Sequence, residues 1–334
     1  RGSPYSVDML RLIQMQSYGR LAHVGEDPHG FYYPPYALLL VYPLIPLPLP
    51  WAQAAWWTAL ECGTCVGVAG AAWLVRWRLP PYRAVLTILW ALLFYPVAWA
   101  LILGQMAMLI FALLVGALVA LKLGRPIWAG ICLALATSKP QMSFLLVPAL
   151  LLWTWNRGRH AGDATTMRSP LPAFLVSMAV LVAISFALVP EWPAQFLGAA
   201  GEYVVMLPHV PSVVQLGRAM GGDRGAYVTV AVVAGLLVWL ARAWRRAWSS
   251  SDLPMYAIGV TLAVTALVAP RTSVVNQAPL IIPLFLLFAS MARSGGWGQA
   301  AVALIQVGLV GGLWVFDLLC FPAPSTGEHW HAQQ

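Results

Sequence analysis

A lysine followed by a proline interrupts an apolar region near the middle of the chain. Lys139 is one of two lysines in the sequence, and residues 127–136 before it carry no charge. A cation at the centre of a bilayer costs roughly 2.5–3.5 kcal/mol on insertion scales, so its presence there favours a functional role. Pro140 removes a backbone donor and disfavours helix at the preceding residue, which predicts a broken helix. We therefore predict a cavity at the outer membrane face in which Lys139 contacts an anion, and a lysine that snorkels to the lipid headgroups is the alternative.

Other polar side chains lie where apolar runs end, on the side of the membrane expected to carry Lys139. They are Gln105, Gln141, Arg271 and Asn276. Guanidinium and ammonium groups both bind phosphate oxygens, so Arg271 joins Lys139 as a candidate phosphate contact. An ordinary polar turn or loop is the alternative explanation for each of these residues.

Acidic residues are candidates for a general base. Those expected on the outer face have no spacing typical of a catalytic carboxylate, and a solvated charge explains each of them. The base is therefore left unassigned, with three candidates in the N-terminal stretch: Asp8, Glu26 and Asp27. The histidines are too sparse to predict a metal site, and no phosphate-binding loop or dinucleotide fingerprint is evident, so we predict neither metal nor cofactor.

The composition places the elements that hold these residues in a membrane. Hydrophobic residues make up 60% of the 334 residues, charged residues make up 9%, and the mean hydropathy is +0.76, which excludes an ordinary soluble domain. The net charge of +8 comes largely from arginines in short loops between apolar runs, so we predict membrane lipids and no nucleic acid as partners. Cys62 and Cys65 have redox spacing but lie inside a long apolar run, where thiols usually serve as small packing residues.

The apolar runs predict an all-α polytopic integral membrane protein. About ten runs are candidates to cross the hydrocarbon, which takes roughly 20 residues, although the two around Lys139 are short. Segment 36–50 is apolar but proline-rich, so it is either re-entrant or spanning. The predicted layout is an outer-face loop with a short amphipathic helix at 1–35, a single transmembrane domain at 36–321 with an outer-face loop at 191–224, and a polar tail at 322–334.

Basic loops predict the orientation in the membrane. Five loops carry Arg or Lys, and two apolar runs separate each loop from the next, so all five are expected on one side. By the positive-inside rule that side is cytoplasmic, and Lys139 then faces outward. The five loops are residues 76–83, 122–125, 157–168, 242–246 and 293.

Several short motifs, in their order along the chain, resemble glycosyltransferase family 87. They are Phe31-Tyr32-Tyr33-Pro34-Pro35, Pro43-Leu44, Gly104-Gln105, and Ala129-Gly130 leading to Lys139-Pro140. Family 87 enzymes have the GT-C fold and include the polyprenyl-phosphate-mannose-dependent mannosyltransferases of bacterial glycolipid synthesis. The resemblance implies a GT-C-like bundle in the bacterial plasma (inner) membrane, which passes a sugar from a polyprenyl-phosphate carrier to an acceptor hydroxyl at the outer face.

The resemblance also implies roles for individual residues. Lys139 corresponds to a contact with the donor phosphate, and Gln105 and Tyr33 to residues that line the cavity. In the family an aspartate soon after the first helix serves as general base. The present sequence opens at Arg1 with a polar stretch, so we expect both that helix and that aspartate upstream of Arg1.

We therefore predict an inverting, metal-independent hexosyltransferase with mannose as the first choice of sugar and a lipid or glycan as acceptor. The residues expected to form its site are Lys139 and Arg271 for the donor phosphate, and Tyr33, Gln105, Gln141 and Asn276 for the cavity. A multi-pass transporter or lipid flippase shares the broken helix and the intramembrane charge, but it should have two related halves, and no internal repeat is evident. A non-catalytic membrane assembly factor is the third class.

Overall fold

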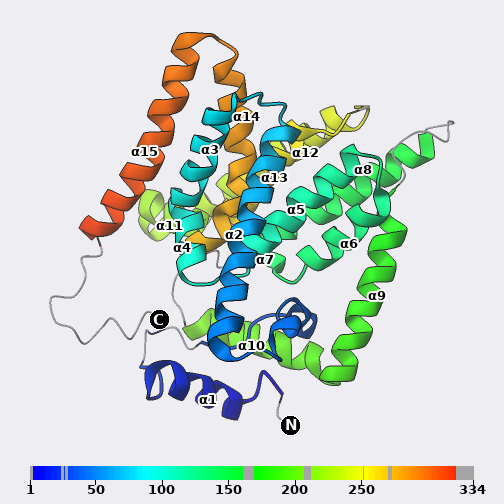
Figure 1. The fold of residues 1–334 in the computed structure, drawn as a ribbon, viewed down its shortest axis with the longest axis vertical. Coiled ribbons are helices and arrows are strands. Elements are labelled where there is room, and N and C mark those ends of the chain that lie inside the picture. Colours follow the sequence, from blue (N-terminus) through cyan, green and yellow to red (C-terminus); the bar gives the residue numbers. More distant parts are fainter. Residues whose placement is uncertain are drawn as a thin grey trace. The chain divides into compact units, whose positions relative to one another are not determined.

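The fold is described by a computed structural model, which covers residues 3–23, 26, 29–160, 169–206, 212–250, 252–269 and 273–320. Helices form all the regular secondary structure of these residues, and no strand occurs among them (Figure 1). The all-α class predicted from the apolar runs is therefore confirmed for this part of the chain.

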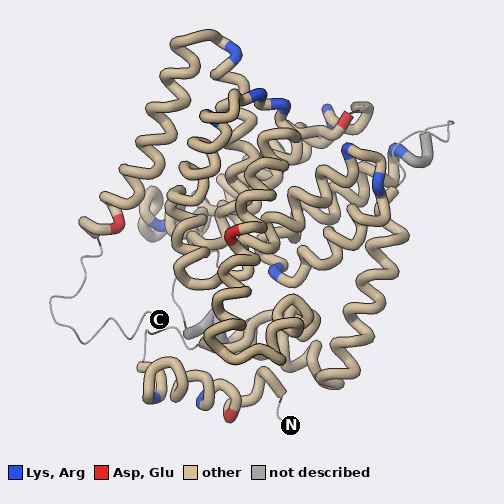
Figure 2. Tube along the Cα trace, in the orientation of Figure 1, with Lys and Arg blue, Asp and Glu red and all other residues tan. Residues whose placement is uncertain are grey.

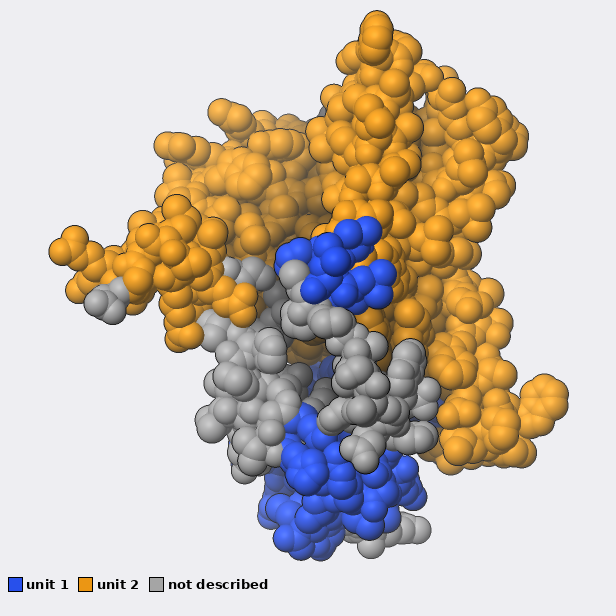
Figure 3. All heavy atoms as spheres, turned by 90° about the vertical axis from the view of Figure 1, so that its left-hand side faces the viewer, with its two compact units in different colours: residues 1–43, 179–209, 315–334 blue, residues 44–178, 210–314 orange. Residues whose placement is uncertain are grey.

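The chain separates into two compact units, which Figure 3 colours separately. Unit 1 contains Arg1–Pro43, Ala179–His209 and Val315–Gln334, and unit 2 contains Leu44–Met178 and Val210–Trp314. Segment 36–321, expected to be a single domain, is thus shared between them. Unit 2 holds the predicted site residues Gln105, Lys139, Gln141 and Asn276, so the architecture of this unit decides how they are positioned.

Unit 2 consists of helices of very different lengths. They are α2 (Leu49–Leu74), α3 (Pro81–Leu93), α4 (Tyr95–Ile102), α5 (Ala107–Lys122), α6 (Pro126–Ala136), α7 (Pro140–Ser143), α8 (Leu146–His160), α11 (Ser212–Gly221), η3 (Gly222–Arg224), α12 (Gly225–Ala247), α13 (Met255–Val268), η4 (Val274–Leu280) and α14 (Ile281–Ala292). Helices α9 (Leu171–Leu188) and α15 (Gly296–Cys320) have residues in both units. Unit 1 contains α1 (Val7–Tyr18), where a short amphipathic helix was expected, and α10 (Trp192–Met206).

Helix α5 forms the core of unit 2 because its sequence is apolar on every side. Its buried residues occur along its whole length, and it packs against α2 and α6. Glycine allows the close approach of α2, since a Cβ at Gly67 would lie 2.6 Å from the ring of Phe111. On α6, a Cβ at Gly130 would lie 2.6 Å from the backbone nitrogen of Phe174. Small residues therefore set the spacing of these helices.

Four helical segments of the described chain are long and apolar enough to cross a membrane: Leu171–Leu188, Gly225–Ala247, Val274–Ala292 and Gly296–Leu319. The pair α3 and α4, bent by 64°, brings the number to five if it forms one span. The structure supports a membrane protein, but the predicted total of about ten spans is not confirmed. Helices α5 and α6 have 16 and 11 residues, fewer than the roughly 20 that a crossing takes, and α5 is buried in protein instead.

The structure adds detail to two segments, of which 36–50 had been left as either re-entrant or spanning. Segment 36–50 forms the 3₁₀ helices η1 (Pro35–Leu40) and η2 (Tyr42–Leu44) and the first residues of α2, so no spanning helix occurs there. Segment 191–224, expected to be a loop, contains helices α10 and α11. In both cases the prolines and polar residues mark helix ends correctly but do not reveal the short helices between them.

The basic loops of unit 2 converge at one end of its helices. Figure 2 shows Lys and Arg positions gathered at the upper ends of these helices. Side chains from different loops also reach neighbouring segments directly. Arg83 Nη1 donates to Gln299 Oε1 at 2.8 Å, Arg157 Nη1 to the Ser250 carbonyl at 2.5 Å and Lys122 Nζ to the Leu74 carbonyl at 3.1 Å, while Arg76 lies 3.9 Å from the Asp252 carboxylate. Helix α5 therefore has a basic end at Lys122, and Gln105 precedes its opposite end.

Candidate active site

The helix break predicted at Lys139 is present. Helix α6 ends at Ala136, and in each of the next three residues the N–H donates to the carbonyl three positions earlier. Lys139 then adopts φ −126° and ψ 79°, outside the helical region, and Pro140 opens α7. Proline suits this position because its missing N–H has no partner at a helix start and because it disfavours helix in the residue before it. The local sequence therefore turns the chain at Lys139.

The side chain of Lys139 points into protein. It is 2% exposed, and its Nζ donates a hydrogen bond to Gln105 Oε1 at 3.2 Å. Helix α7, which follows it, packs against α5, α6 and α13. The snorkelling alternative needs an exposed head group, so the burial of Lys139 contradicts it. An amide oxygen carries no formal charge, so Gln105 orients the ammonium without neutralising it.

Gln105 is positioned by a tight turn between α4 and α5. Gly104 has φ 59°, and its N–H donates to the Leu101 carbonyl, while the N–H of Gln105 donates to the Ala100 carbonyl at 2.7 Å. This pair of bonds is the Schellman ending of a helix, which favours glycine at the left-handed residue. Two tryptophans of α2 hold the same turn: Trp56 donates to the Gly104 carbonyl at 2.8 Å, and Trp57 donates to the Leu101 carbonyl at 3.0 Å. Gln105, which accepts the hydrogen bond from Lys139, is therefore held in place by the hydrogen bonds of this turn.

A small cavity with a mixed polar and apolar lining lies between α7, α13 and η4. It has a volume of about 10 Å³, close to the space of one water. Gln141, Asn276, Gln277 and Thr265 supply its polar atoms. Since Lys139 directly precedes α7 and Gln141 lies within it, one short helix links this cavity to the Lys139–Gln105 pair.

Two buried polar atoms near this break have no hydrogen-bond partner within the described chain. They are Oγ of Ser138, which is 0% exposed, and Oδ1 of Asn276, which is 8% exposed. Leaving such a group unpaired costs about 1–3 kcal/mol, and native proteins mostly avoid it. Of the two residues, Asn276 lines the small cavity, so its amide oxygen is the one available to a ligand that supplies a donor.

A comparison with known proteins shows the family of this chain. A model of glycosyltransferase family 87 matches residues 31–270. The chain belongs to glycosyltransferase family 87. The resemblance carried by the short motifs is confirmed, and membership implies a membrane glycosyltransferase with a donor and an acceptor substrate. The comparison with curated proteins and that with solved structures each gave no match.

The family 87 match includes some of the predicted site residues and not others. Gln105, Lys139 and Gln141 lie within it, and Asn276 lies beyond its end. Tyr33 also lies within it and belongs to unit 1, where its ring packs edge-on against Phe31 at 5.9 Å and its carbonyl accepts a hydrogen bond from the Tyr5 hydroxyl. Asp27 and Arg271 lie outside the described residues.

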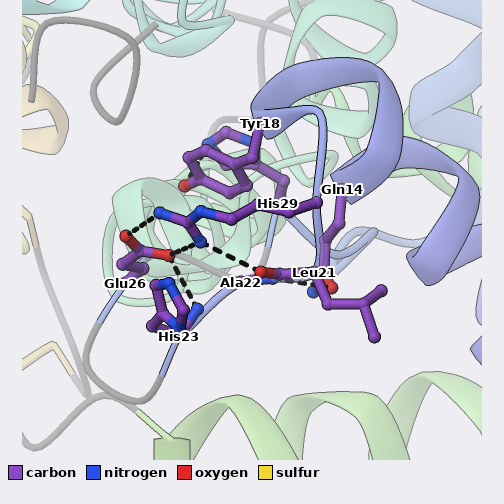
Figure 4. A network of polar contacts seen from close by, with 8 residues as sticks. Gln14, Tyr18, Leu21, Ala22, His23, Glu26 and His29 are labelled. Carbon is purple, nitrogen blue, oxygen red and sulfur yellow. Dashed lines mark hydrogen bonds and ion pairs between the residues drawn. The ribbon is translucent and has the colours of Figure 1, made fainter. Parts of the chain in front are cut away.

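Glu26, one of the candidate general bases, forms an ion pair with Arg20. Both of its carboxylate oxygens accept hydrogen bonds from Arg20, at 2.8 and 2.7 Å, and the N–H of His23 donates to it at 2.7 Å (Figure 4). The Arg20 guanidinium, with the His23 N–H, lowers the pKa of the Glu26 carboxyl to about 2. Such a carboxylate is a poor proton acceptor at neutral pH. Asp8 lies exposed in the first turn of α1, and no comparable ion pair holds it in the described part of the chain.

Three polar residues of the site were not among those predicted from the sequence. Ser138 precedes the predicted lysine, Gln277 follows the predicted Asn276, and Thr265 lies inside an apolar helix. Thr265 bonds its own helix, donating to the Thr261 carbonyl at 2.7 Å, which makes it compatible with an apolar surrounding. The signal available in the sequence was a hydroxyl near the end of an apolar run.

Proposed function

We propose that this family 87 member is a hexosyltransferase of GT-C type that moves mannose, or a related hexose, from a polyprenyl-phosphate carrier to a lipid or glycan acceptor. The buried Lys139 ammonium, oriented by Gln105 at a helix break inside an apolar bundle, supports this function most directly. A polyprenyl-phosphate donor arrives within the bilayer, so its phosphate needs a cation at this kind of place and no nucleotide-binding domain.

The proposed reaction is a single displacement without a metal. The acceptor hydroxyl oxygen bonds to the anomeric carbon of the sugar while the bond from that carbon to the phosphate oxygen breaks, and attack from the opposite face inverts the configuration. The carrier phosphate leaves with the electron pair, and Lys139, with Arg271 as a second candidate, stabilises its added negative charge. A carboxylate takes the acceptor proton, and Asp8 and Asp27 remain candidates for it, since Glu26 is held by Arg20.

The amides beside Lys139 are proposed to bind the sugar. Gln141 and Asn276 line the same small cavity, and Oδ1 of Asn276 is buried without a partner in the described chain. An amide accepts a hydrogen bond through its oxygen and donates through its nitrogen, so the two residues can pair with several sugar hydroxyls. The cavity of about 10 Å³ holds about one water, so the sugar enters only after α7 and η4 separate.

The distribution of charge supports an outward-facing site in a bacterial plasma membrane. The basic loops meet at the Lys122 end of α5, and the Lys139–Gln105 pair lies at the other end. Under the positive-inside rule the basic end is cytoplasmic, and the pair then faces outward. Sugar transfer at that face uses a lipid carrier because nucleotide sugars remain in the cytoplasm.

The test is sugar transfer by the full membrane protein in vesicles that contain polyprenyl-phosphate-mannose. Lys139→Ala is expected to abolish transfer, whereas Arg246→Ala, which removes an exposed cation of α12, is expected to leave it unchanged. The amount of each variant in the membrane separates loss of chemistry from loss of folding. Transfer retained by Lys139→Ala removes this lysine from the mechanism.

A multi-pass transporter or lipid flippase is the second candidate, because a broken helix and a buried cation also suit a transport pathway. The same vesicles distinguish the two functions. Movement of the lipid-linked sugar across the bilayer without formation of a hexosyl product would favour transport. A hexosyl product without such movement would favour the transferase.

A further inference from the structure

A second charged feature of unit 2 lies at the basic end of α5. There residues of α2, α3 and the end of α5 line an open cavity of about 640 Å³. Small apolar side chains and two tryptophans form most of its wall, and three cations also line it: Arg76, Arg78 and Lys122. This volume is typical of a site for a small molecule.

The cations are placed by specific contacts. Lys122 Nζ donates to the Leu74 carbonyl at 3.1 Å and lies 4.7 Å from the centre of the Trp73 ring, so its head is fixed at the cavity wall. Arg76 and Arg78 are both exposed. The Asp252 carboxylate lies 3.9 Å from Arg76 and offsets one positive charge. A net positive charge remains at the cavity, which favours an anion.

The apolar wall of the cavity continues onto the outside of the same helices. Val66 and Trp73 of α2 and Val85, Leu86 and Leu89 of α3 are exposed on the structure. Acyl chains cover such surfaces in a membrane, and cationic pockets between transmembrane helices on the cytoplasmic side bind anionic headgroups. A free anion would gain nothing from this apolar surface, whereas a phospholipid uses both parts.

We propose that this cavity binds an anionic phospholipid of the surrounding membrane, with its phosphate at Arg76, Arg78 and Lys122 and its acyl chains along α2 and α3. The site is separate from the one at Lys139. Helix α5 has 16 residues, with Gln105 before its start and Lys122 at its end, so its length of about 24 Å separates the two. The proposal does not depend on which sugar the protein transfers.

Native mass spectrometry of the purified full chain in a neutral detergent tests this site. Phosphatidylglycerol, phosphatidylcholine and inorganic phosphate are added in separate titrations. The wild-type protein is expected to bind phosphatidylglycerol about tenfold more tightly than phosphatidylcholine, because only the former carries a net negative charge for the cations. The triple cation variant, Arg76→Gln/Arg78→Gln/Lys122→Gln, is expected to lose this preference.

Matched variants keep the test specific. Arg242→Gln/Arg245→Gln/Arg246→Gln removes the same charge from exposed residues of α12 and is expected to bind like the wild type. Ala69→Phe fills the cavity wall from an exposed position without a change in charge and is expected to weaken phosphatidylglycerol binding, whereas Ala54→Phe, exposed elsewhere on α2, is not.

Four results would overturn the proposal. They are equal losses in the two triple variants, equal affinity for the two phospholipids, unchanged binding in Ala69→Phe, and inorganic phosphate that binds as tightly as phosphatidylglycerol. The last result would mark a site for free anions. Because Ala69→Phe retains every cation, its outcome stands even if the triple cation variant does not fold.

Discussion

The hydrogen bond between Lys139 and Gln105 is measurable as a coupling free energy. Lys139→Met removes the charge and keeps the length of the side chain, and Gln105→Leu removes the acceptor and keeps its volume. Because Lys139 is 2% exposed, water does not readily replace the lost acceptor, so Gln105→Leu alone is expected to lower the free energy of unfolding by about 1–3 kcal/mol. When Lys139 is already replaced by Met, Gln105→Leu should lower the free energy of unfolding much less.

The size of the coupling follows from the geometry. Hydrogen bonds between helices in a membrane protein average about 0.6 kcal/mol, and bonds to an ionised donor are roughly twice as strong. The 3.2 Å between Nζ and Oε1 is at the long end of the range, so we expect a coupling of about 1 kcal/mol. Reversible unfolding of the two single variants and the double variant in mixed detergent micelles measures it.

A distant pair provides the control for this cycle. Gln299→Leu removes an acceptor at the basic end of unit 2, where Arg83 donates to it at 2.8 Å. Its effect should add to that of Lys139→Met within about 0.3–0.5 kcal/mol. A Lys139–Gln105 coupling as small as that control value would refute the arrangement described for the site.

Two further predictions concern the turn before α5 and the network of unit 1. Gly104→Ala places a side chain on a residue with φ 59°, so it should lower the free energy of unfolding by about 1–2 kcal/mol. Gly308→Ala in α15 is the control, because an added Cβ there would have no atom within 4 Å, and it should not lower that free energy. Thermal unfolding of the two variants compares them. Since the pKa of Glu26 is lowered from 4.5 to about 2, its stabilising contribution is present above about pH 4.5 and lost as the pH falls through about 2. Hydrogen-exchange protection of the His23 amide, which donates to Glu26, should therefore fall over this interval, and Glu26→Gln should remove that pH dependence.

Local features of the structure were predictable because single residues dictate them. Pro140 breaks the helix at Lys139 wherever the segment lies, and Gly104 can end a helix in the left-handed conformation. The basic loops could likewise be placed on one side, because charge bias is a property of the sequence. None of these inferences depended on knowing which helices pack together.

The contacts between distant segments were not predictable from the sequence. The pairing of Lys139 with Gln105 depends on how α4, α5 and α7 pack, and no local pattern specifies it. The predicted number of spans is also not confirmed by the described chain, since a helix surrounded by protein, such as α5, need not match the thickness of the bilayer. Likewise, the polar residues of segment 191–224 favoured a loop, and the two helices within it were not predicted.

The packing of α5 argues that the lipid cavity and the transfer site act independently. The turns at both its ends close in the same way, with φ 59° at Gly104 and φ 67° at Gly124. Between them, α2 approaches so closely that a Cβ at Gly67 would lie 2.6 Å from the Phe111 ring, and close-packed helices do not slide freely. We therefore expect phosphatidylglycerol to raise the unfolding temperature without changing the KM for polyprenyl-phosphate-mannose. A KM that changes with this lipid in the wild type, but not in the triple cation variant, would instead show that α5 transmits lipid binding to Lys139.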